Sequence, residues 1–521
     1  MANRLSVNMK TFFMIFMITF SVFVFTNDAH RYTFDESLAQ EQSLRMATNE
    51  PHPKYVEDKS RPFFEYPSLY PPHTNFRPIC ENFILCSHAS VVHSFTQVPF
   101  IAINELFHII TMENKSLEFT NFSDQSYVLW RNSLDPSFTF MELFYGPFFS
   151  ALSVSILFLV ARTFYSIKTS IILSFLFAFS TILWAYSQTS LNVVPATFFI
   201  ILGYYFFRRF QSKYSYKSIV ICAVSFGTAF LIRNDAILFL IPLFFYFIYE
   251  MIRHKNKILN TICFVGPLIS SYGISQLIDK IRIGFEADRG TIDVISATQY
   301  VGGAGETGVL FDIPVHLNAF GLLFSPGVGL FIFAPILLTV FISFPDFFKR
   351  YKLQCLLFLS IFGFFLAFYG SNGYWHGLNG WGARYMLVIV AFFILPLGAS
   401  IEQRKNISFR LSIFVLAVPG VFFNLVYLVQ DVSWFVWGIM ASRSGHLYDV
   451  GGASNLWISP LVLWTFEYSQ LTQSIISLFT FDHDIFLLHT FGAGIYSLIV
   501  TVVLVPLIFV FFQRTFRYTE Q

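Results

Sequence analysis

The stretch FVFTNDAHRYTFDESL, residues 23–38, places a dense group of ionisable side chains directly after an apolar run. Asp28 is the first acid of this group. The polar residues that follow it are His30, Arg31, Tyr32, Asp35 and Glu36. A carboxylate one or two residues beyond a membrane span lies in the interface and is partly desolvated, which suits a general base. The alternative is an ordinary solvated helix end. The density of the cluster favours the functional interpretation.

A second charged turn, IRNDA, carries Arg233 and Asp235 between two apolar runs. Ionisable residues at membrane depth are costly and indicate function by default. Arg233 could donate to a phosphate group. Alternatively, Arg233 and Asp235 form an interfacial ion pair with Asn234 in the turn, which would contribute little stability.

A third stretch, YGSNGYWHGLNGWGARYM at residues 369–386, combines five glycines with polar and aromatic side chains. Glycines allow a ligand to approach backbone amides closely. The Arg384 guanidinium matches the geometry of phosphate oxygens, and His376 lies in the same run. Trp375 and Trp381 suit either sugar stacking or a membrane-interface belt. A belt around a tight turn explains the aromatic residues, but not the glycine-rich run with His376 and Arg384.

A fourth stretch, FGLLFSPGVGLFIFAPILL at residues 320–338, contains Pro326, Gly327, Gly329 and Pro335. A helix broken here would leave free N–H groups at the positive end of a helix dipole, which attracts anions. A kinked packing helix explains the pattern equally well. No P-loop, GxGxxG after a strand, HExxH, CxxC pair or GxSxG motif occurs in the sequence, so nucleotide-binding and zinc-hydrolase classes lose their main support.

The composition determines what kind of scaffold must position these residues. Of 521 residues, 55% are hydrophobic, 20% are aromatic and 12% are charged, and the mean hydropathy is +0.60. Soluble domains have about 25% charged residues, and runs of about 18 apolar residues are long enough to cross a bilayer. We therefore expect an all-α polytopic membrane protein. The net charge of +2 and the lack of a basic stripe argue against nucleic-acid binding.

We expect about 12 transmembrane helices, with the loops of one side rich in Lys and Arg and therefore cytoplasmic, together with both termini. The first apolar run, residues 11–26, follows Arg4 and Lys10 and is interpreted as a retained signal anchor. The expected spans are 9–26, 139–161, 169–186, 190–207, 218–232, 236–252, 259–278, 320–344, 353–369, 385–401, 410–429 and 486–512. The opposite side carries long loops at 27–138, 279–319 and 430–485. We expect a first module at 1–429, which includes loop 27–138, and a second unit at 430–521 comprising the last outer loop and last span.

The first outer loop is expected to be helical rather than a plain linker. Residues 33–47 are good helix formers, and residues 91–110 suit an interfacial or re-entrant helix. Sequons at Asn114 and Asn121 lie on the predicted outer side. Cys80 and Cys86 both lie in this loop, and whether they form a disulfide is left open by the sequence. The remaining cysteines lie in apolar runs and are expected to be packing residues: Cys222, Cys263 and Cys355.

Six segments, in order, resemble the GT-C class of integral-membrane glycosyltransferases, in the branch of the protein mannosyltransferases and lipid A aminoarabinose transferases. The segments are NDAHRYTFDESLAQEQSL, YPSLYPP, LWAYSQTSLNVVPATFFIILGYYFFRR, LIRNDAILFLIPL, GLLFSPGVGLFIFAPILL and WHGLNGWGARYMLVIVAFFILPL. The sequence departs from the family pattern at Ala29 and Asn192, where acids are common, and at Asn234, where proline is common. Its Tyr-Pro-Pro loop is also unusually long, which leaves acceptor recognition open.

The resemblance implies an enzyme that moves a sugar from a polyprenyl-phosphate donor to a lipid, glycan or protein acceptor at the extracytoplasmic face, by inverting displacement. Asp28 is then the general base. Arg384, Arg233 and His376 are then the donor-phosphate ligands. The acceptor and sugar contacts implied are Arg31, Tyr32, Tyr66, Tyr70, Trp375 and Trp381. Metal need is open: the cluster of Asp28, Asp35 and Glu36 could hold Mg²⁺ or Mn²⁺, but related transferases include metal-independent ones.

Three other functions share parts of this pattern. A transporter or flippase for lipid-linked sugars would have the same aromatic residues and arginines, but would not need an acid facing an acceptor. A polysaccharide ligase or polymerase would rely on arginines and a histidine. A non-catalytic subunit of a membrane complex is the third. Transfer activity of an Asp28→Asn variant separates the first of these from the enzyme.

Overall fold

The computed structural model is built from helices, and the residues it describes contain no strand. The described residues are 2–29, 34–48, 90–110, 139–252, 256–283, 315–372, 375–377, 380–430, 460–478 and 485–517. The all-α membrane architecture expected from composition is confirmed.

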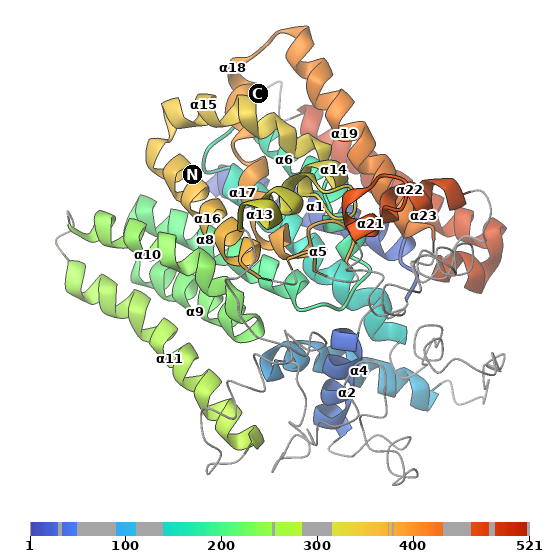
Figure 1. Cartoon of the computed structure of the whole chain (residues 1–521), viewed down its shortest axis with the longest axis horizontal. Coiled ribbons are helices and arrows are strands. Elements are labelled where there is room, and N and C mark those ends of the chain that lie inside the picture. The colour runs from blue at the N-terminus through green and yellow to red at the C-terminus, as the bar shows by residue number, and fades with distance from the viewer. Residues whose placement is uncertain are drawn as a thin grey trace.

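In the first half of the chain, α2 and α4 lie together at one end of the bundle, and α8, α9 and α10 lie side by side within it (Figure 1). Their bounds are α1 Ala2–Phe25, α2 Phe34–Thr48, α4 Val91–Ile110, α5 Thr139–Ala161, α6 Ile167–Phe179, α7 Leu183–Tyr186, α8 Val193–Lys213, α9 Tyr216–Ile232, η1 Asn234–Ala236, α10 Ile237–Ile252 and α11 Lys257–Ile283. Helices α2 and α4 form where the sequence predicts helices in the first outer loop.

The second half is more interrupted. Its bounds are α13 Val315–Phe324, α14 Leu330–Phe333, η2 Pro335–Thr339, α15 Val340–Arg350, α16 Lys352–Gly370, η3 Arg384–Met386, α17 Leu387–Ile394, α18 Leu397–Gln403, α19 Ile407–Leu428, α21 Pro460–Trp464, α22 Gln470–Ser477 and α23 Phe486–Arg517. Helix α23 packs on α1, where the Tyr496 hydroxyl donates to the Phe25 carbonyl at 2.9 Å. The division at residue 429 stays a prediction.

Within the described ranges, nine helices are long and apolar enough to cross a bilayer. Three of the twelve expected spans differ from this set. The spans at 169–186 and 218–232 correspond to the shorter apolar helices α6 and α9, and the span at 320–344 is divided among α13, α14, η2 and α15. Helix α4 is not among the nine candidates.

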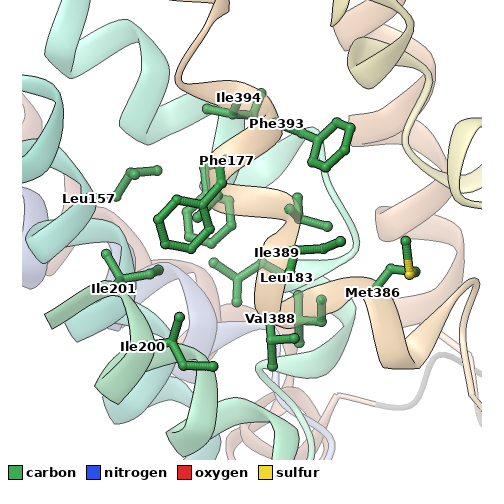
Figure 2. Packing of buried hydrophobic residues seen from close by; sticks show 14 of the residues in the cluster. Leu157, Phe177, Leu183, Ile200, Ile201, Met386, Val388, Ile389, Phe393 and Ile394 are labelled. Carbon is green, nitrogen blue, oxygen red and sulfur yellow. The ribbon is translucent and has the colours of Figure 1, made fainter. Parts of the chain in front are cut away.

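The centre of the bundle is apolar and closely packed. Every residue of α17 is buried, and Figure 2 shows its side chains Val388, Ile389 and Phe393 near residues from α5, α6 and α8. The bundle surface is apolar too, with Ile262 on α11 and Val502 on α23 more than half exposed. An apolar surface of this kind faces lipid in a membrane protein, since lipid chains are as apolar as the side chains.

The two ends of the bundle differ in chemistry. Helices α15 and α18 lie at one end, and α2 and α4 lie at the other (Figure 1). At the first end, Arg404 pairs with Asp346 at 2.6 Å and Arg350 with Glu402 at 3.1 Å, and all four residues lie in or beside the loops predicted to be cytoplasmic. The opposite end holds the candidate site.

A break near Pro326, one of the two alternatives considered for this stretch, is present. Helix α13 ends at Phe324, and the next helix begins at Leu330. Two of the N–H groups at the break are bonded within the protein: Gly327 N donates to Leu463 O at 3.1 Å and Gly329 N to Ser325 O at 2.7 Å. A Cβ on Gly327 would lie 2.5 Å from Val462 O, so α21 packs against a backbone that only glycine allows. The break therefore serves helix packing.

Candidate active site

Asp28 lies three residues beyond the end of α1 and is 1% exposed. The backbone around it is bonded to neighbouring helices. Phe486 N, at the start of α23, donates to the Asn27 carbonyl at 3.0 Å. Since a solvated helix end would leave this acid in water, the structure excludes that alternative. The carboxylate is desolvated, as a base at the membrane edge should be.

Asn27 and Ala29 set the direction of the backbone at Asp28. The Asn27 amide nitrogen donates to the carbonyl of Glu142, on α5, at 3.1 Å, and the Asn27 Oδ1 accepts from Ala29 N at 2.7 Å. Ala29 has φ +58°, a left-handed conformation that non-glycine residues seldom adopt. The buried Asn27 amide therefore holds a strained turn and fixes Asp28 between α1 and α5.

Residues 183–192, which we term the connecting segment, run from α7 to the start of α8 and contact the α1 end. The Trp184 indole N–H donates to Thr26 Oγ1 at 3.1 Å. The Gln188 amide donates to Thr26 O at 2.8 Å and to Leu428 O, at the end of α19, at 3.3 Å. Two residues of one segment, four positions apart, thus support the turn that presents Asp28.

Two other residues of the connecting segment, Tyr186 and Asn192, reach different parts of the site. The Tyr186 hydroxyl lies beside Gly380, where an added Cβ would be 2.7 Å from its oxygen, and the same Cβ would be 3.1 Å from Arg384 Cβ. The Asn192 Oδ1 accepts from Arg233 Nη1 at 3.2 Å. The connecting segment therefore links the Asp28 turn to both arginines predicted from the sequence.

Ser190 joins the connecting segment to the two helices of the first outer loop. Its N–H donates to Glu36 Oε1 on α2 at 2.9 Å, and its hydroxyl oxygen accepts from the Gln40 amide at 2.9 Å. Its carbonyl lies 3.0 Å from His93 Nε2 on α4. The Gln40 amide also donates to the Glu142 carboxylate. Burial lowers the pKa of His93 to about 4, so this histidine is neutral at physiological pH.

Sequence reasoning missed this buried polar layer. Glu142 is 2% exposed at the start of a long apolar helix, and the rule that ionisable residues at membrane depth indicate function would have selected it. Ser190, Gln40 and His93 carry no comparable signal, because their importance comes from contacts between residues 97 to 154 positions apart in the sequence.

Arg233 is held in an ion pair. Its Nε lies 2.6 and 2.7 Å from the two carboxylate oxygens of Asp235, and its Nη2 donates to the Tyr369 hydroxyl at 2.9 Å. The Tyr369 hydroxyl in turn donates to Asp235. The ion-pair alternative considered for this turn is therefore the arrangement observed, and it is nearly buried, with side chains 11% and 10% exposed.

Arg384 approaches the same aromatic ring as Arg233. The Cζ atom of each arginine lies 5.3 Å from the centroid of the Tyr385 ring, so the two guanidinium carbons are no farther apart than twice that distance. The Tyr385 ring stacks on Tyr369 at 4.3 Å with an interplanar angle of 7°. Arg384 is 8% exposed. Two cations and two stacked rings thus form one compact group.

His376 lies beside Arg384 and is 3% exposed. Burial, together with the positive charge of Arg384, lowers the pKa of His376 to about 4. The imidazole is therefore neutral at pH 7. It can donate or accept a hydrogen bond, but it adds no positive charge to the group.

Trp375 and Trp381 are buried against other aromatic rings. Trp375 lies 5.6 Å from Trp464, and Trp381 lies 4.9 Å from Phe333 in an edge-to-face arrangement and 4.7 Å from Tyr427. Both rings pack the glycine-rich stretch, residues 369–386, against neighbouring helices. A role in stacking on a sugar stays a prediction.

The remaining predicted residues fall wholly or partly outside the described ranges. These are Arg31, Tyr32, Tyr66, Tyr70, Cys80, Cys86 and the side chain of Asp35. Among the side chains that the structure does describe, no three His, Cys, Asp or Glu residues are grouped as a metal site. Glu36, one of the predicted metal ligands, accepts from Ser190 instead. The metal hypothesis remains untested because Asp35 is one of its three ligands.

The segment that joins the two halves of the site is also the part with a recognisable family pattern. Residues 144–275 match the sequence model of the family described as dolichyl-phosphate-mannose-protein mannosyltransferase. The chain resembles the GT-C membrane glycosyltransferases. The match includes the connecting segment, Arg233 and Asp235, and excludes Asp28 and Arg384. No curated protein sequence has significant similarity to this chain.

Two solved structures of GT-C enzymes are distantly similar in fold. One is ArnT from Cupriavidus metallidurans bound to undecaprenyl phosphate, with 11% identity, coverage of 89% of this chain and 77% of that chain, and a TM-score of 0.47. The other is the archaeal oligosaccharyltransferase AglB from Archaeoglobus fulgidus with an inhibitory peptide and a dolichol-phosphate, with 12% identity, coverage of 89% and 60%, and a TM-score of 0.40.

Proposed function

We propose that this protein is a membrane glycosyltransferase that moves a sugar from a polyprenyl-phosphate donor to an acceptor hydroxyl at the extracytoplasmic face. The observation that carries the proposal is the connecting segment. It contacts the turn of the buried acid Asp28 through Trp184 and lies beside Arg384 through Tyr186. A desolvated base and a cation held by one short segment suit a displacement at a sugar carbon whose leaving group is a lipid phosphate.

In the proposed reaction, the Asp28 carboxylate accepts the proton of the acceptor O–H group as the acceptor oxygen attacks the anomeric carbon. The bond between that carbon and the phosphate oxygen breaks, and its electron pair leaves with the polyprenyl phosphate. One bond forms as one breaks on the opposite side of the carbon, so the configuration inverts. The proton remains on Asp28 until solvent removes it.

Arg384 is proposed to stabilise the negative charge that grows on the leaving phosphate. A guanidinium offers two parallel N–H donors to phosphate oxygens. In a site shielded from water such a donor stabilises developing charge more than it would in solution. His376, being neutral, is proposed to add a hydrogen bond to the headgroup rather than charge.

The location of the site supports an extracytoplasmic reaction. Asp28, Ser190 and Arg384 lie at the end of the bundle opposite the basic loops, which carry Arg404 and Arg350. Basic loops mark the cytoplasmic side. Orientation in the membrane is tested by the accessibility of single cysteines placed in each loop.

Metal dependence is part of the proposal only as a hypothesis on Asp28, Asp35 and Glu36. Removal of divalent cations with EDTA tests it. Activity that is lost on chelation and restored by Mn²⁺ or Mg²⁺ would support a cation, and Asp35→Asn should then raise the cation concentration needed for half-maximal activity.

The experiment that tests the proposed function measures transfer from a radiolabelled polyprenyl-phosphate sugar by the Asp28→Asn variant in detergent or liposomes. We expect the rate to fall at least about 100-fold, the lower end of what a general base contributes, while binding of the donor persists. Asp346→Asn is the matched control, because Asp346 is a buried acid at the opposite end. Near-normal transfer by Asp28→Asn would reject the mechanism, and lipid translocation without transfer would favour a flippase.

A further inference from the structure

The guanidinium of Arg233 is occupied by contacts within the protein. Nε faces both oxygens of Asp235, Nη1 donates to Asn192 and Nη2 donates to Tyr369. All three nitrogens therefore have a protein acceptor. A phosphate binding here would compete with the Asp235 carboxylate for the same cation.

The charge of Arg233 is matched by Asp235 at a nearly buried position. Breaking a buried ion pair leaves one charge without compensation and is strongly unfavourable. Tyr369 adds a hydroxyl donor to the Asp235 carboxylate, which ties α16 to the pair. Because the contacts among Arg233, Asp235 and Tyr369 are unfavourable to break, this group is poorly suited to exchange ligands in each catalytic cycle.

The same group sets the position of the Tyr385 ring. Tyr369 stacks on Tyr385, and the Arg233 guanidinium lies over the Tyr385 ring. Tyr385 is the chain neighbour of Arg384, whose guanidinium lies at the same distance from the ring centroid. Cation–π contacts of this kind favour one position of the cation over the ring face, more strongly where water is excluded. Arg233 can thus act on Arg384 through one ring.

We propose that Arg233 is a positioning residue, which together with Asp235 and Tyr369 fixes the Tyr385 ring and thereby the Arg384 guanidinium. This inference rests on the proposed function, because Arg384 is the proposed phosphate ligand. The sequence suggested that both arginines bind phosphate. In this proposal the two arginines have different roles. Arg384 binds the donor headgroup, and Arg233 fixes the Tyr385 ring that positions the Arg384 guanidinium.

The test is a double-mutant cycle between position 385 and the Arg233–Asp235 pair, in which Arg233→Gln is always made together with Asp235→Asn so that neither buried charge loses its partner. The variants are Arg233→Gln with Asp235→Asn, Tyr385→Leu, and the combination of both changes. The readout is the Kd for a polyprenyl monophosphate, the product of transfer. If Arg233 acts through Tyr385, each single change should weaken binding about tenfold, equivalent to about 1.4 kcal/mol, and the double variant should be no weaker than the worse single variant.

Two results would overturn the proposal. A double variant weakened about 100-fold, the product of independent effects, would make Arg233 a separate phosphate ligand. An unchanged Kd for Arg233→Gln would remove its role altogether. If the unmodified protein does not bind polyprenyl monophosphate, the proposed function fails instead. The same cycle is then measured by thermal denaturation, where additive effects at 233 and 385 would reject the coupling itself.

Discussion

The Trp184 indole N–H donates to Thr26 Oγ1 at 3.1 Å and joins α7 to the turn that presents Asp28. Two residues later on the same helical turn, the Tyr186 hydroxyl lies beside Gly380 in the turn that carries Arg384. In the proposed function, this segment is what holds an acid after the first span and an arginine more than 350 residues later in one site. The proposal therefore gives the connecting segment a structural role rather than a chemical one.

Trp184→Phe should impair turnover more than donor binding. The change keeps an aromatic ring but removes the N–H donor to Thr26, and loss of one hydrogen bond typically destabilises a protein by about 1 kcal/mol. We expect kcat to fall several-fold with the donor KM unchanged. Thr26→Val removes the other partner, so the double variant should be no more impaired than Trp184→Phe. Additive losses would mean that this bond does not link the two residues functionally.

Gly146→Ala should destabilise the protein and reduce activity. Gly146 lies on α5, and an added Cβ would clash with the Ser187 carbonyl and lie 2.5 Å from the Thr189 carbonyl, both in the connecting segment. Backbone atoms cannot rotate away, and overpacking costs about 1–3 kcal/mol. Thermal denaturation in detergent measures the effect. Gly363→Ala is the control, because nothing lies within 4 Å of its Cβ position, and it should be neutral or stabilising.

Arg384 variants should change the use of the donor. Arg384→Ala removes the proposed phosphate contact, so we expect the donor KM to rise at least about tenfold, in line with about 1.5–3 kcal/mol for a charge-assisted hydrogen bond. Arg384→Lys keeps the charge but not the planar fork and should be intermediate. Arg404→Ala, at the opposite end, should leave the donor KM unchanged. An unaltered donor titration for Arg384→Ala would reject the phosphate role.

The two buried histidines should make the fold sensitive to acid. His93 and His376 both have a pKa lowered from 6.5 to about 4. Between these values the unfolded chain binds more protons than the folded chain, so stability falls as the pH drops from about 6.5 to about 4 and is constant above that window. The maximum loss is about 3 kcal/mol for each histidine.

Thermal denaturation between pH 4 and pH 7 measures this effect. His376→Gln and His93→Gln should each flatten the pH dependence, and the two changes together should flatten it most. The same slope in the unmodified protein and in both variants would show that neither histidine titrates in this window. Transfer activity should show no inflection from His376 near pH 6.5, since its imidazole is already neutral there.

Local sequence patterns were sufficient for part of the fold. Long apolar runs define nine candidate spans, and helix-forming residues in the first outer loop define α2 and α4. The sequence suggested the interruption near Pro326, because proline and glycine both disfavour a helix interior, although other prolines, such as Pro147 and Pro242, lie inside helices. The packing partner of this interruption could not be predicted, because Gly327 N donates to the carbonyl of Leu463, which is more than 130 residues away.

The candidate site could also be predicted from the sequence only in part. Asp28 and Arg384 stand out because their residue types are unusual where an apolar run ends or begins. The state of Arg233 could not be decided from IRNDA, because the choice between phosphate and Asp235 depends on Asn192 and Tyr369, which pack from other helices. Trp381 was likewise ambiguous, since its packing partners Phe333 and Tyr427 are distant in sequence.

The central claim is that Asp28 and Arg384 face the same donor headgroup. Cryo-electron microscopy of the Asp28→Asn variant with an uncleaved polyprenyl-phosphate sugar tests it most directly. We predict the phosphate within hydrogen-bond distance of the Arg384 guanidinium and the anomeric carbon on the side of residue 28. A headgroup bound at the α15–α18 end, or one that contacts Arg384 with residue 28 separated from it by packed protein, would contradict the account.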